Sequence, residues 1–144
     1  TQDEFKTRFT SWKAGRSQPW SMRLRATALS EASIIINSDE PSSLGPKLAG
    51  GTNPGNTFSP TKAELGRLID DLLVTKVFDL YDGHYGAYAQ GGGLIGPDLV
   101  VTIGGIEKHV SYDEDLSPSA SWEAGAIKGA TDAIRTLGLK YIKR

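Results

Sequence analysis

The stretch that decides the fold is DLVVTIGGIEKHVSY, residues 98–112. Apolar and polar residues alternate on both sides of Gly104 and Gly105, and a period of two is typical of a half-buried strand. A Gly-Gly pair supplies the positive φ angles that a tight two-residue turn requires. The stretch therefore predicts a β-hairpin. Pairing across the turn places the following residues on one face, together with Lys108: Leu99, Val101, Ile103, Ile106, Val110 and Tyr112.

A second hairpin is expected near the N-terminus. Residues 20–28, WSMRLRATA, alternate strictly, and residues 32–37, ASIIIN, are rich in β-branched isoleucine. The three residues between these segments are few enough for a hairpin loop. Strands that arrive in hairpins predict a mainly antiparallel sheet.

Two helices follow from caps and apolar spacing. Thr61 and Glu64 have the spacing of a capping box, and apolar residues recur with the helical period in the residues that follow. Residues 61–75 are therefore expected to be helical. Residues 117–137 carry a narrow apolar stripe with a proline at the start. Gly138 is expected to end this helix, and residues 139–144 to add an edge strand.

An aromatic stripe marks the first helix, expected over residues 3–14 and stopped at Gly15 (segment 1–15). Phe5, Phe9 and Trp12 recur at i, i+4 and i+7 and so share one side of that helix. They either pack into the core or form a contact surface for a partner.

The remaining segments are expected to lack regular structure or to be briefly extended. Residues 38–60 hold four prolines and four glycines, which indicates a long loop, either mobile or binding. Residues 76–82 alternate and predict a short extended piece. Residues 83–97 are rich in glycine and tyrosine and are expected to form a loop, with Tyr85 and Tyr88 as candidate binding residues.

Taken together, these elements predict an α+β fold. Its sheet is mainly antiparallel and built from two hairpins, and two or three helices pack on one face. A length of 144 residues suits a single domain spanning 1–144.

Composition excludes several classes of function. There are no cysteines, so disulfides, thiolate catalysis and cysteine-based zinc sites are impossible. The net charge of −1 argues against a general grip on nucleic acid, although Arg16, Arg23 and Arg25 could form a modest basic stripe. No apolar run approaches the length of a membrane span.

Candidate catalytic and metal-binding residues are few. His84 follows Asp82 closely enough for the carboxylate to orient the imidazole, which is half of a general-base arrangement, but no nucleophile is marked by its local sequence. A loop histidine is the alternative, and the same holds for His109. Asp113 and Asp115 are weak candidates for a cation site, because their spacing is not that of an EF-hand loop. No cofactor is expected.

Residues 61–137 resemble a family of uncharacterised domains found in bacterial exported proteins and lipoproteins. The resemblance rests on a capped helix that leads into an F-x-L-x-D motif with a nearby tyrosine, then a hairpin, then a helix. The matching positions are Phe78, Leu80, Asp82, Tyr85, Val101, Ile103, Gly105, Lys108 and Val110. A looser similarity exists to small proteinaceous inhibitors of bacterial metalloproteases, which share the order hairpin, helix, hairpin, helix. Neither resemblance transfers a catalytic residue; each implies a binding or inhibitory role outside the cytoplasm.

The expected function is therefore binding of another protein, without catalysis, by an exported protein or a subunit of a larger assembly. The first residue is Thr1, which would fit a cleaved leader or a shortened chain equally well. An inhibitor of a secreted protease is one alternative, and a hydrolase that uses His84 with Asp82 is another.

Overall fold

A computed structural model describes residues 2–25, 32–46, 56–85, 97–112 and 122–141. The elements in chain order are α1 (Gln2–Lys13), β1 (Trp20–Arg25), β2 (Ala32–Asn37), β3 (Ser42–Pro46), β4 (Asn56–Phe58), α2 (Lys62–Thr75), the 3₁₀-helix η1 (Val77–Asp79), β5 (Gly83–Tyr85), β6 (Asp98–Ile103), β7 (Ile106–Tyr112) and α3 (Trp122–Lys140).

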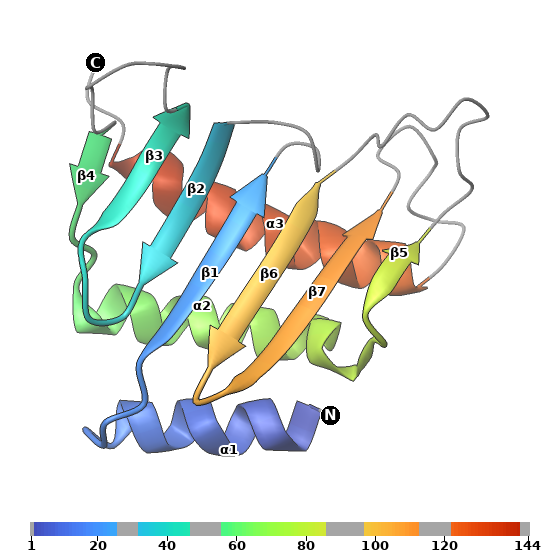
Figure 1. Cartoon of the computed structure of the whole chain (residues 1–144), viewed down its shortest axis with the longest axis horizontal. Helices are drawn as coiled ribbons and strands as arrows, with labels where there is room; N and C mark the ends of the chain where they lie inside the picture. Colours follow the sequence, from blue (N-terminus) through green and yellow to red (C-terminus); the bar gives the residue numbers. More distant parts are fainter. Residues whose placement is uncertain (1, 26–31, 47–55, 86–96, 113–121, 142–144) are drawn as a thin grey trace.

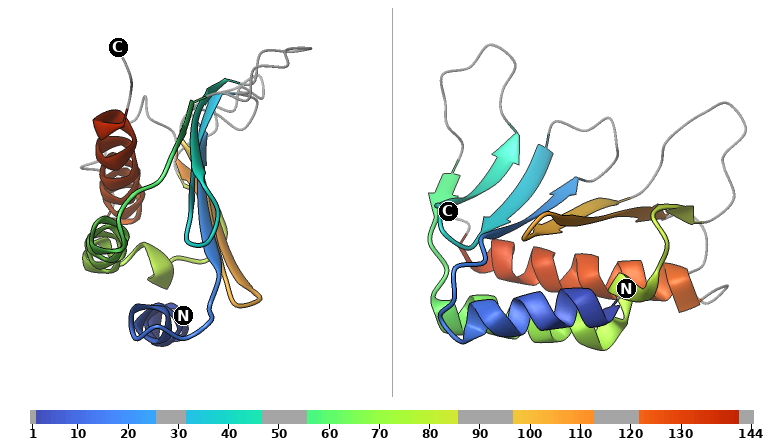
Figure 2. Two further views of the ribbon diagram at one scale, coloured as in Figure 1. Left: turned by 90° about the vertical axis from the view of Figure 1, so that its left-hand side faces the viewer. Right: turned by 60° about the horizontal axis from the view of Figure 1, so that its bottom comes forward.

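The seven described strands form one sheet in the order β4-β3-β2-β1-β6-β7-β5. Neighbouring strands run antiparallel, except that β5 runs parallel to β7. The helices α1, α2 and α3 all lie on one side of this sheet, and the other side is uncovered by any of them (Figures 1 and 2). The prediction of an α+β fold with a mainly antiparallel sheet is thus confirmed.

The hairpin over residues 98–112 is confirmed in both its register and its turn. Ile103 pairs with Ile106 across Gly104 and Gly105, whose φ angles are 53° and 87°. Strand β1 pairs with β6 as well as with β2, so this contact joins the two hairpins into one sheet. The inward residues of β6 and β7 enter a hydrophobic core shared with α1, α2 and α3.

The capping box of α2 forms as expected. The Thr61 hydroxyl accepts a hydrogen bond from the Glu64 backbone N–H at 3.1 Å, and the Glu64 carboxylate accepts one from the Thr61 N–H at 2.9 Å. These two bonds satisfy donors that the first turn of a helix leaves free. The helix ends at Thr75, and its C-cap Lys76 adopts the left-handed conformation with φ 64°.

The aromatic stripe of α1 is part of the core. Phe5, Phe9 and Trp12 are only 2%, 0% and 8% exposed. Phe5 stacks on Phe78 of η1 with ring centroids 4.5 Å apart, and Trp12 meets Trp20 of β1 edge to face at 5.4 Å. Because they are buried, these three side chains are core residues and not a contact surface. They close the core at the end of the sheet that is drawn lowest in Figure 1.

Segment 38–60 contains two strands where the sequence favoured a long loop. Strand β3 pairs with β2, and β4 pairs with β3 at the edge of the sheet. The Ser42 hydroxyl is fully buried and accepts a hydrogen bond from the Asn37 N–H at 3.0 Å. Pairing with β2 thus orders residues whose own composition gives little strand signal.

Segment 76–82 is helical at its start, not extended. Residues Val77 and Phe78 are adjacent and both fully buried, which an alternating strand would not allow. The Thr75 hydroxyl accepts a hydrogen bond from the Val77 N–H at 3.2 Å and so supports the 3₁₀ turn. The loop expected over residues 83–97 also begins differently, because its first three residues form β5 beside β7.

The last helix ends later than expected. Gly138 is buried inside α3, and the helix continues to Lys140. The Tyr141 N–H then donates to the Gly138 carbonyl at 3.0 Å. An edge strand starting at Leu139 is therefore wrong, since packing of α3 against the core extends the helix past its glycine. None of the described helices is both long and apolar enough to span a membrane.

Candidate functional site

Two aromatic side chains project into solvent at one end of the molecule. Tyr81, just after η1, is 88% exposed, and Trp122, the first residue of α3, is 59% exposed. Strand β5 and the start of α3 lie at this same end (Figures 1 and 2). We refer to Tyr81, Tyr85 and Trp122 together as the aromatic end.

Tyr85 supports the aromatic end from within. Its hydroxyl donates a hydrogen bond to the Tyr81 backbone carbonyl at 2.6 Å, and its ring packs against the core. Burial raises the pKa of Tyr85, and the negative charge of Glu123 raises it further. The phenol therefore stays protonated and remains a donor that holds the turn at Tyr81.

A lysine on the inner face of the sheet fixes the segment that presents Tyr81. The Lys108 ammonium donates to the Leu80 carbonyl and lies 3.5 Å from the Asp82 carboxylate. The same carboxylate accepts a hydrogen bond from the His109 backbone N–H at 3.3 Å. Lys108, which interrupts the apolar face of β7, thus ties the chain around Tyr81 to that strand.

The structure places only some of the candidate residues from the sequence at the aromatic end. Tyr85 belongs to the aromatic end, as a half-buried support more than as an exposed contact. Asp82 is engaged with β7, while the side chain of His84 lies outside the described residues. Tyr88, Asp113 and Asp115 also lie outside them.

Exposed aromatic side chains are suited to binding. Tyrosine and tryptophan combine a large apolar surface with a polar tip and lose little conformational entropy when they are covered, and they are enriched among residues that dominate binding energy. Val74, in the last turn of α2, adds a further exposed apolar side chain, at 81%. Surface of this kind favours contact with another macromolecule.

A charged network lies on the uncovered face of the sheet. Asp98 of β6 is only 3% exposed, and one of its oxygens accepts a hydrogen bond from Arg25 of β1 at 2.9 Å. The other oxygen lies 2.7 Å from Nε2 of His109 on β7. Because an ionised carboxylate can only accept, Nε2 carries the hydrogen. The network therefore links three adjacent strands.

Two opposing effects act on the pKa of Asp98. Burial raises it, but the hydrogen bonds and positive charges of Arg25 and His109 lower it more, so it lies below its ordinary value of 3.8. Asp98 is thus ionised, and the positive charge of Arg25 balances its negative charge. It adds no free negative charge to the face.

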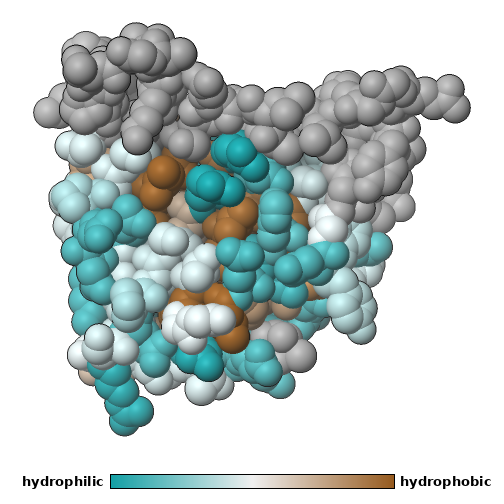
Figure 3. Space-filling model, in the orientation of Figure 1, coloured by the Kyte–Doolittle hydropathy of each residue, from teal (hydrophilic) through white to brown (hydrophobic). Residues whose placement is uncertain are grey.

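The part of this face that the structure describes is a mixture of hydrophilic and hydrophobic surface (Figure 3). Arg23 and Glu107 are exposed, and neither has an ion-pair partner among the residues that the structure describes. Two half-buried apolar side chains flank Arg23 on the neighbouring strands, Ile35 on β2 and Val100 on β6. Along each strand, these outward-facing residues alternate with residues whose side chains enter the core on the other side of the sheet.

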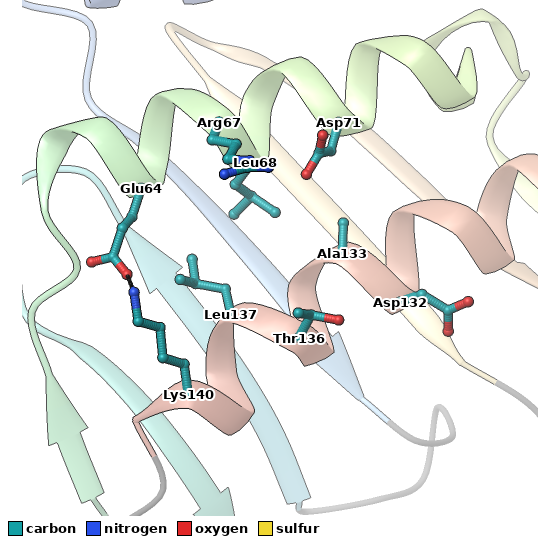
Figure 4. A pocket seen from close by; sticks show the side chains of 9 residues that line it. All are labelled: Glu64, Arg67, Leu68, Asp71, Asp132, Ala133, Thr136, Leu137 and Lys140. Atoms are coloured by element: carbon teal, nitrogen blue, oxygen red, sulfur yellow. Dashed lines mark hydrogen bonds and ion pairs between the residues drawn. The ribbon is translucent and has the colours of Figure 1, made fainter.

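A groove of about 440 Å³ separates α2 from α3 on the opposite side of the molecule (Figure 4). Glu64 and Lys140 approach to 2.6 Å across one end of it, and Leu68 and Leu137 lie in its apolar middle. Hydrogen bonds from Lys140, from Tyr141 and from the Thr61 backbone lower the pKa of Glu64 to about 2. The same carboxylate caps α2, so this end of the groove is a structural tie between two helices.

Within the described part of the chain, no cluster of three or more histidine and acidic residues is arranged to hold a metal ion. Comparisons with protein-family models, with curated proteins and with solved structures found no match.

Sequence reasoning missed Tyr81 and Trp122, since exposure depends on what the rest of the chain leaves uncovered. The Asp98–His109 contact could have been found. In the predicted hairpin Asp98 lies opposite Ser111. His109, two residues before Ser111, is therefore the diagonal neighbour of Asp98 on the same face of the sheet. The contact of Arg25 with Asp98 could not have been found, because it depends on the pairing of β1 with β6.

Proposed function

We propose that this chain is a non-enzymatic binding protein that contacts another protein through the aromatic end. The observation that carries the proposal is the exposure of Tyr81, in the segment between η1 and β5, at 88%, and of Trp122, at the start of α3, at 59%. The fixed turn beneath Tyr81 favours binding further, because a surface that is ordered in advance loses less entropy on association.

Location outside the cytoplasm is also part of the proposal. It rests on the resemblance of residues 61–137 to domains of bacterial exported proteins. An inhibitor of a secreted protease would be one form of such a binding protein, with the protease as its partner.

The three tryptophans offer a direct probe of the aromatic end. Trp12 and Trp20 are 8% and 4% exposed, whereas Trp122 is largely open to solvent. Acrylamide should therefore quench mainly the fluorescence of Trp122, and a bound partner should protect it. Trp122→Phe should remove the quenchable component, which assigns the signal to that residue.

The function is tested by affinity capture from an extract of the source cells with chemical cross-linking. Wild-type protein is compared with the double variant Tyr81→Ala/Trp122→Ala and with Leu139→Ala. Leu139 is the matched control, since it is an apolar side chain 64% exposed at the other end of α3. We expect the double variant to lose a specific partner at least tenfold and the control to retain it. Equal capture by all three proteins, or loss with Leu139→Ala alone, would contradict the proposal.

A protease panel separates the inhibitor from other binding proteins. Inhibition by the wild type that disappears in Tyr81→Ala/Trp122→Ala would identify the partner as a protease. Capture of a partner without inhibition of any protease would favour an adaptor or an assembly subunit.

A further inference from the structure

The uncovered face of the sheet carries two exposed opposite charges at the corners of one patch. Arg23 of β1 is in register with Val100 of β6, and Val100 with His109 of β7. One step along the strands on the same face, Thr102 is in register with Glu107. Arg23 and Glu107 therefore occupy diagonal corners, with Val100 and Thr102 between them.

The two charges do not pair with each other in this structure. Adjacent strands lie about 4.8 Å apart and alternate residues about 6.7 Å apart, so the two Cα atoms are separated by roughly 12 Å. No ion pair joins either side chain to another described residue. A partner that offers one negative and one positive charge at the same diagonal spacing would pair with both.

We propose that the partner is a second copy of this chain, packed face to face about a two-fold axis. An axis that lies in the plane of the face, passes between Val100 and Thr102, and is perpendicular to the line from Arg23 to Glu107 exchanges the two corners. Arg23 then meets Glu107 of the partner subunit, and Glu107 meets Arg23 of the partner subunit. A self-complementary patch of this kind is what an isologous dimer requires.

The rest of the face is compatible with being covered. Asp98 is already paired with Arg25 and hydrogen-bonded to His109, so covering it leaves no unpaired carboxylate, which would otherwise oppose association. Val100 lies next to the axis and Ile35 beside Arg23, so both half-buried apolar side chains would be buried further.

The face is also large enough. Its seven strands, roughly 4.8 Å apart, extend over about 30 Å, which is the scale of an interface that buries about 800 Å² on each partner. The mixed polarity of the patch indicates an interface closer to a reversible dimer than to an obligate one. This dimer goes beyond the proposed function, because it uses a different surface and leaves the aromatic end free.

The test is a charge exchange followed by sedimentation equilibrium over micromolar to millimolar concentrations. Wild-type protein is expected to dimerise reversibly. Arg23→Glu alone and Glu107→Arg alone each bring like charges together at both symmetric contacts. Each should weaken association by about a hundredfold.

Mixing the two single variants provides the decisive arm. In the mixture, Glu at position 23 of one chain faces Arg at position 107 of the other, and the native pair forms at the second contact. A heterodimer should therefore form between proteins that are monomeric alone. The double variant Arg23→Glu/Glu107→Arg should dimerise with itself like the wild type.

Two results would overturn the dimer proposal. One is a wild-type monomer at the highest concentration; the other is a dimer that survives Arg23→Glu or Glu107→Arg. Circular dichroism and thermal unfolding of each variant establish that it is folded, which is expected for substitutions of exposed side chains. The variant Tyr81→Ala/Trp122→Ala should dimerise normally, so failure of the dimer and failure of the proposed function remain distinguishable.

Discussion

Gly129 of α3 lies directly against Thr75, the last residue of α2. A Cβ atom placed on Gly129 would come within 2.9 Å of the Thr75 Cγ2 methyl group. The threonine cannot easily turn away, because its hydroxyl donates to the Leu72 carbonyl at 2.5 Å and accepts from the Val77 N–H at 3.2 Å. The glycine thus permits a close approach between the two helices at this point.

Replacing Gly129 with alanine should therefore destabilise the protein relative to the same change one turn earlier. Gly125 is the matched control, since a Cβ there meets nothing within 4 Å. Alanine favours a helix over glycine by about 1 kcal/mol, so Gly125→Ala should stabilise the fold. At Gly129 overpacking should exceed that gain, and the two variants should differ by about 1–3 kcal/mol in the free energy of unfolding. Urea denaturation measures the difference; equal stability of the two variants would contradict the close approach.

Truncation of the aromatic stripe of α1 should show its role in the core. Phe9 is fully buried between Trp20 and Phe78, with both ring centroids at 5.8 Å. Phe9→Ala should lower the free energy of unfolding by about 3–5 kcal/mol through lost burial and a residual cavity. Tyr81→Ala, at an exposed aromatic, should change it by less than about 0.5 kcal/mol. Chemical denaturation of the two variants distinguishes a core helix from one held loosely at the surface.

Acid should weaken the tie between α2 and α3 at Glu64. Its folded pKa of about 2 is lower than its ordinary value of 4.5. A depressed carboxylate pKa contributes stability above the unfolded value, and that contribution is lost as the pH falls from about 4.5 towards 2. Glu64→Gln can still accept the capping hydrogen bond but cannot form the ion pair with Lys140.

The variant Glu64→Gln should therefore be less stable than the wild type near neutral pH, and the difference should shrink across this acid range. Urea midpoints measured at successive pH values give the comparison. Asp98 also has a lowered pKa and is present in both proteins, so only the difference between the two curves reports on Glu64. A constant difference at all pH values would contradict the assignment.

Loss of the Asp98 charge should destabilise the sheet at the meeting of β1, β6 and β7. Asp98→Asn keeps the side-chain size but removes the negative charge that faces Arg25 and His109. Since the carboxylate is almost fully buried, we expect a loss of about 1–3 kcal/mol in the free energy of unfolding.

The control for Asp98 is Asp132→Asn, which alters an ion pair with Lys128 on the exposed surface of α3. Exposed helical pairs of this spacing contribute about 0.3–0.5 kcal/mol, so the control should change little. Denaturant titrations of both variants test the contrast, and similar losses at the two sites would argue against a buried network at Asp98.

The sequence by itself determined the elements that local rules specify. The Gly104-Gly105 turn fixes the hairpin because few other residues accept its positive φ angles, and alternation around it fixes which face is apolar. The Thr61–Glu64 capping box fixes the start of α2 for an equally local reason, since both bonds join residues three apart. The α+β class follows from the order of these elements.

Tertiary structure decided what depends on distant partners. Strands β3 and β4 have little propensity of their own; β3 forms because β2 offers unpaired backbone groups beside it, and β4 forms because β3 then offers its own. Gly138 does not end α3, because burial of that helix outweighs the cost of one glycine. Exposure of Tyr81 and Trp122, the link from Arg25 to Asp98, and the diagonal of Arg23 and Glu107 all require the strand order and the placement of helices on one face. Such features cannot be read from spacing along the chain, since the residues involved meet only when the sheet is assembled.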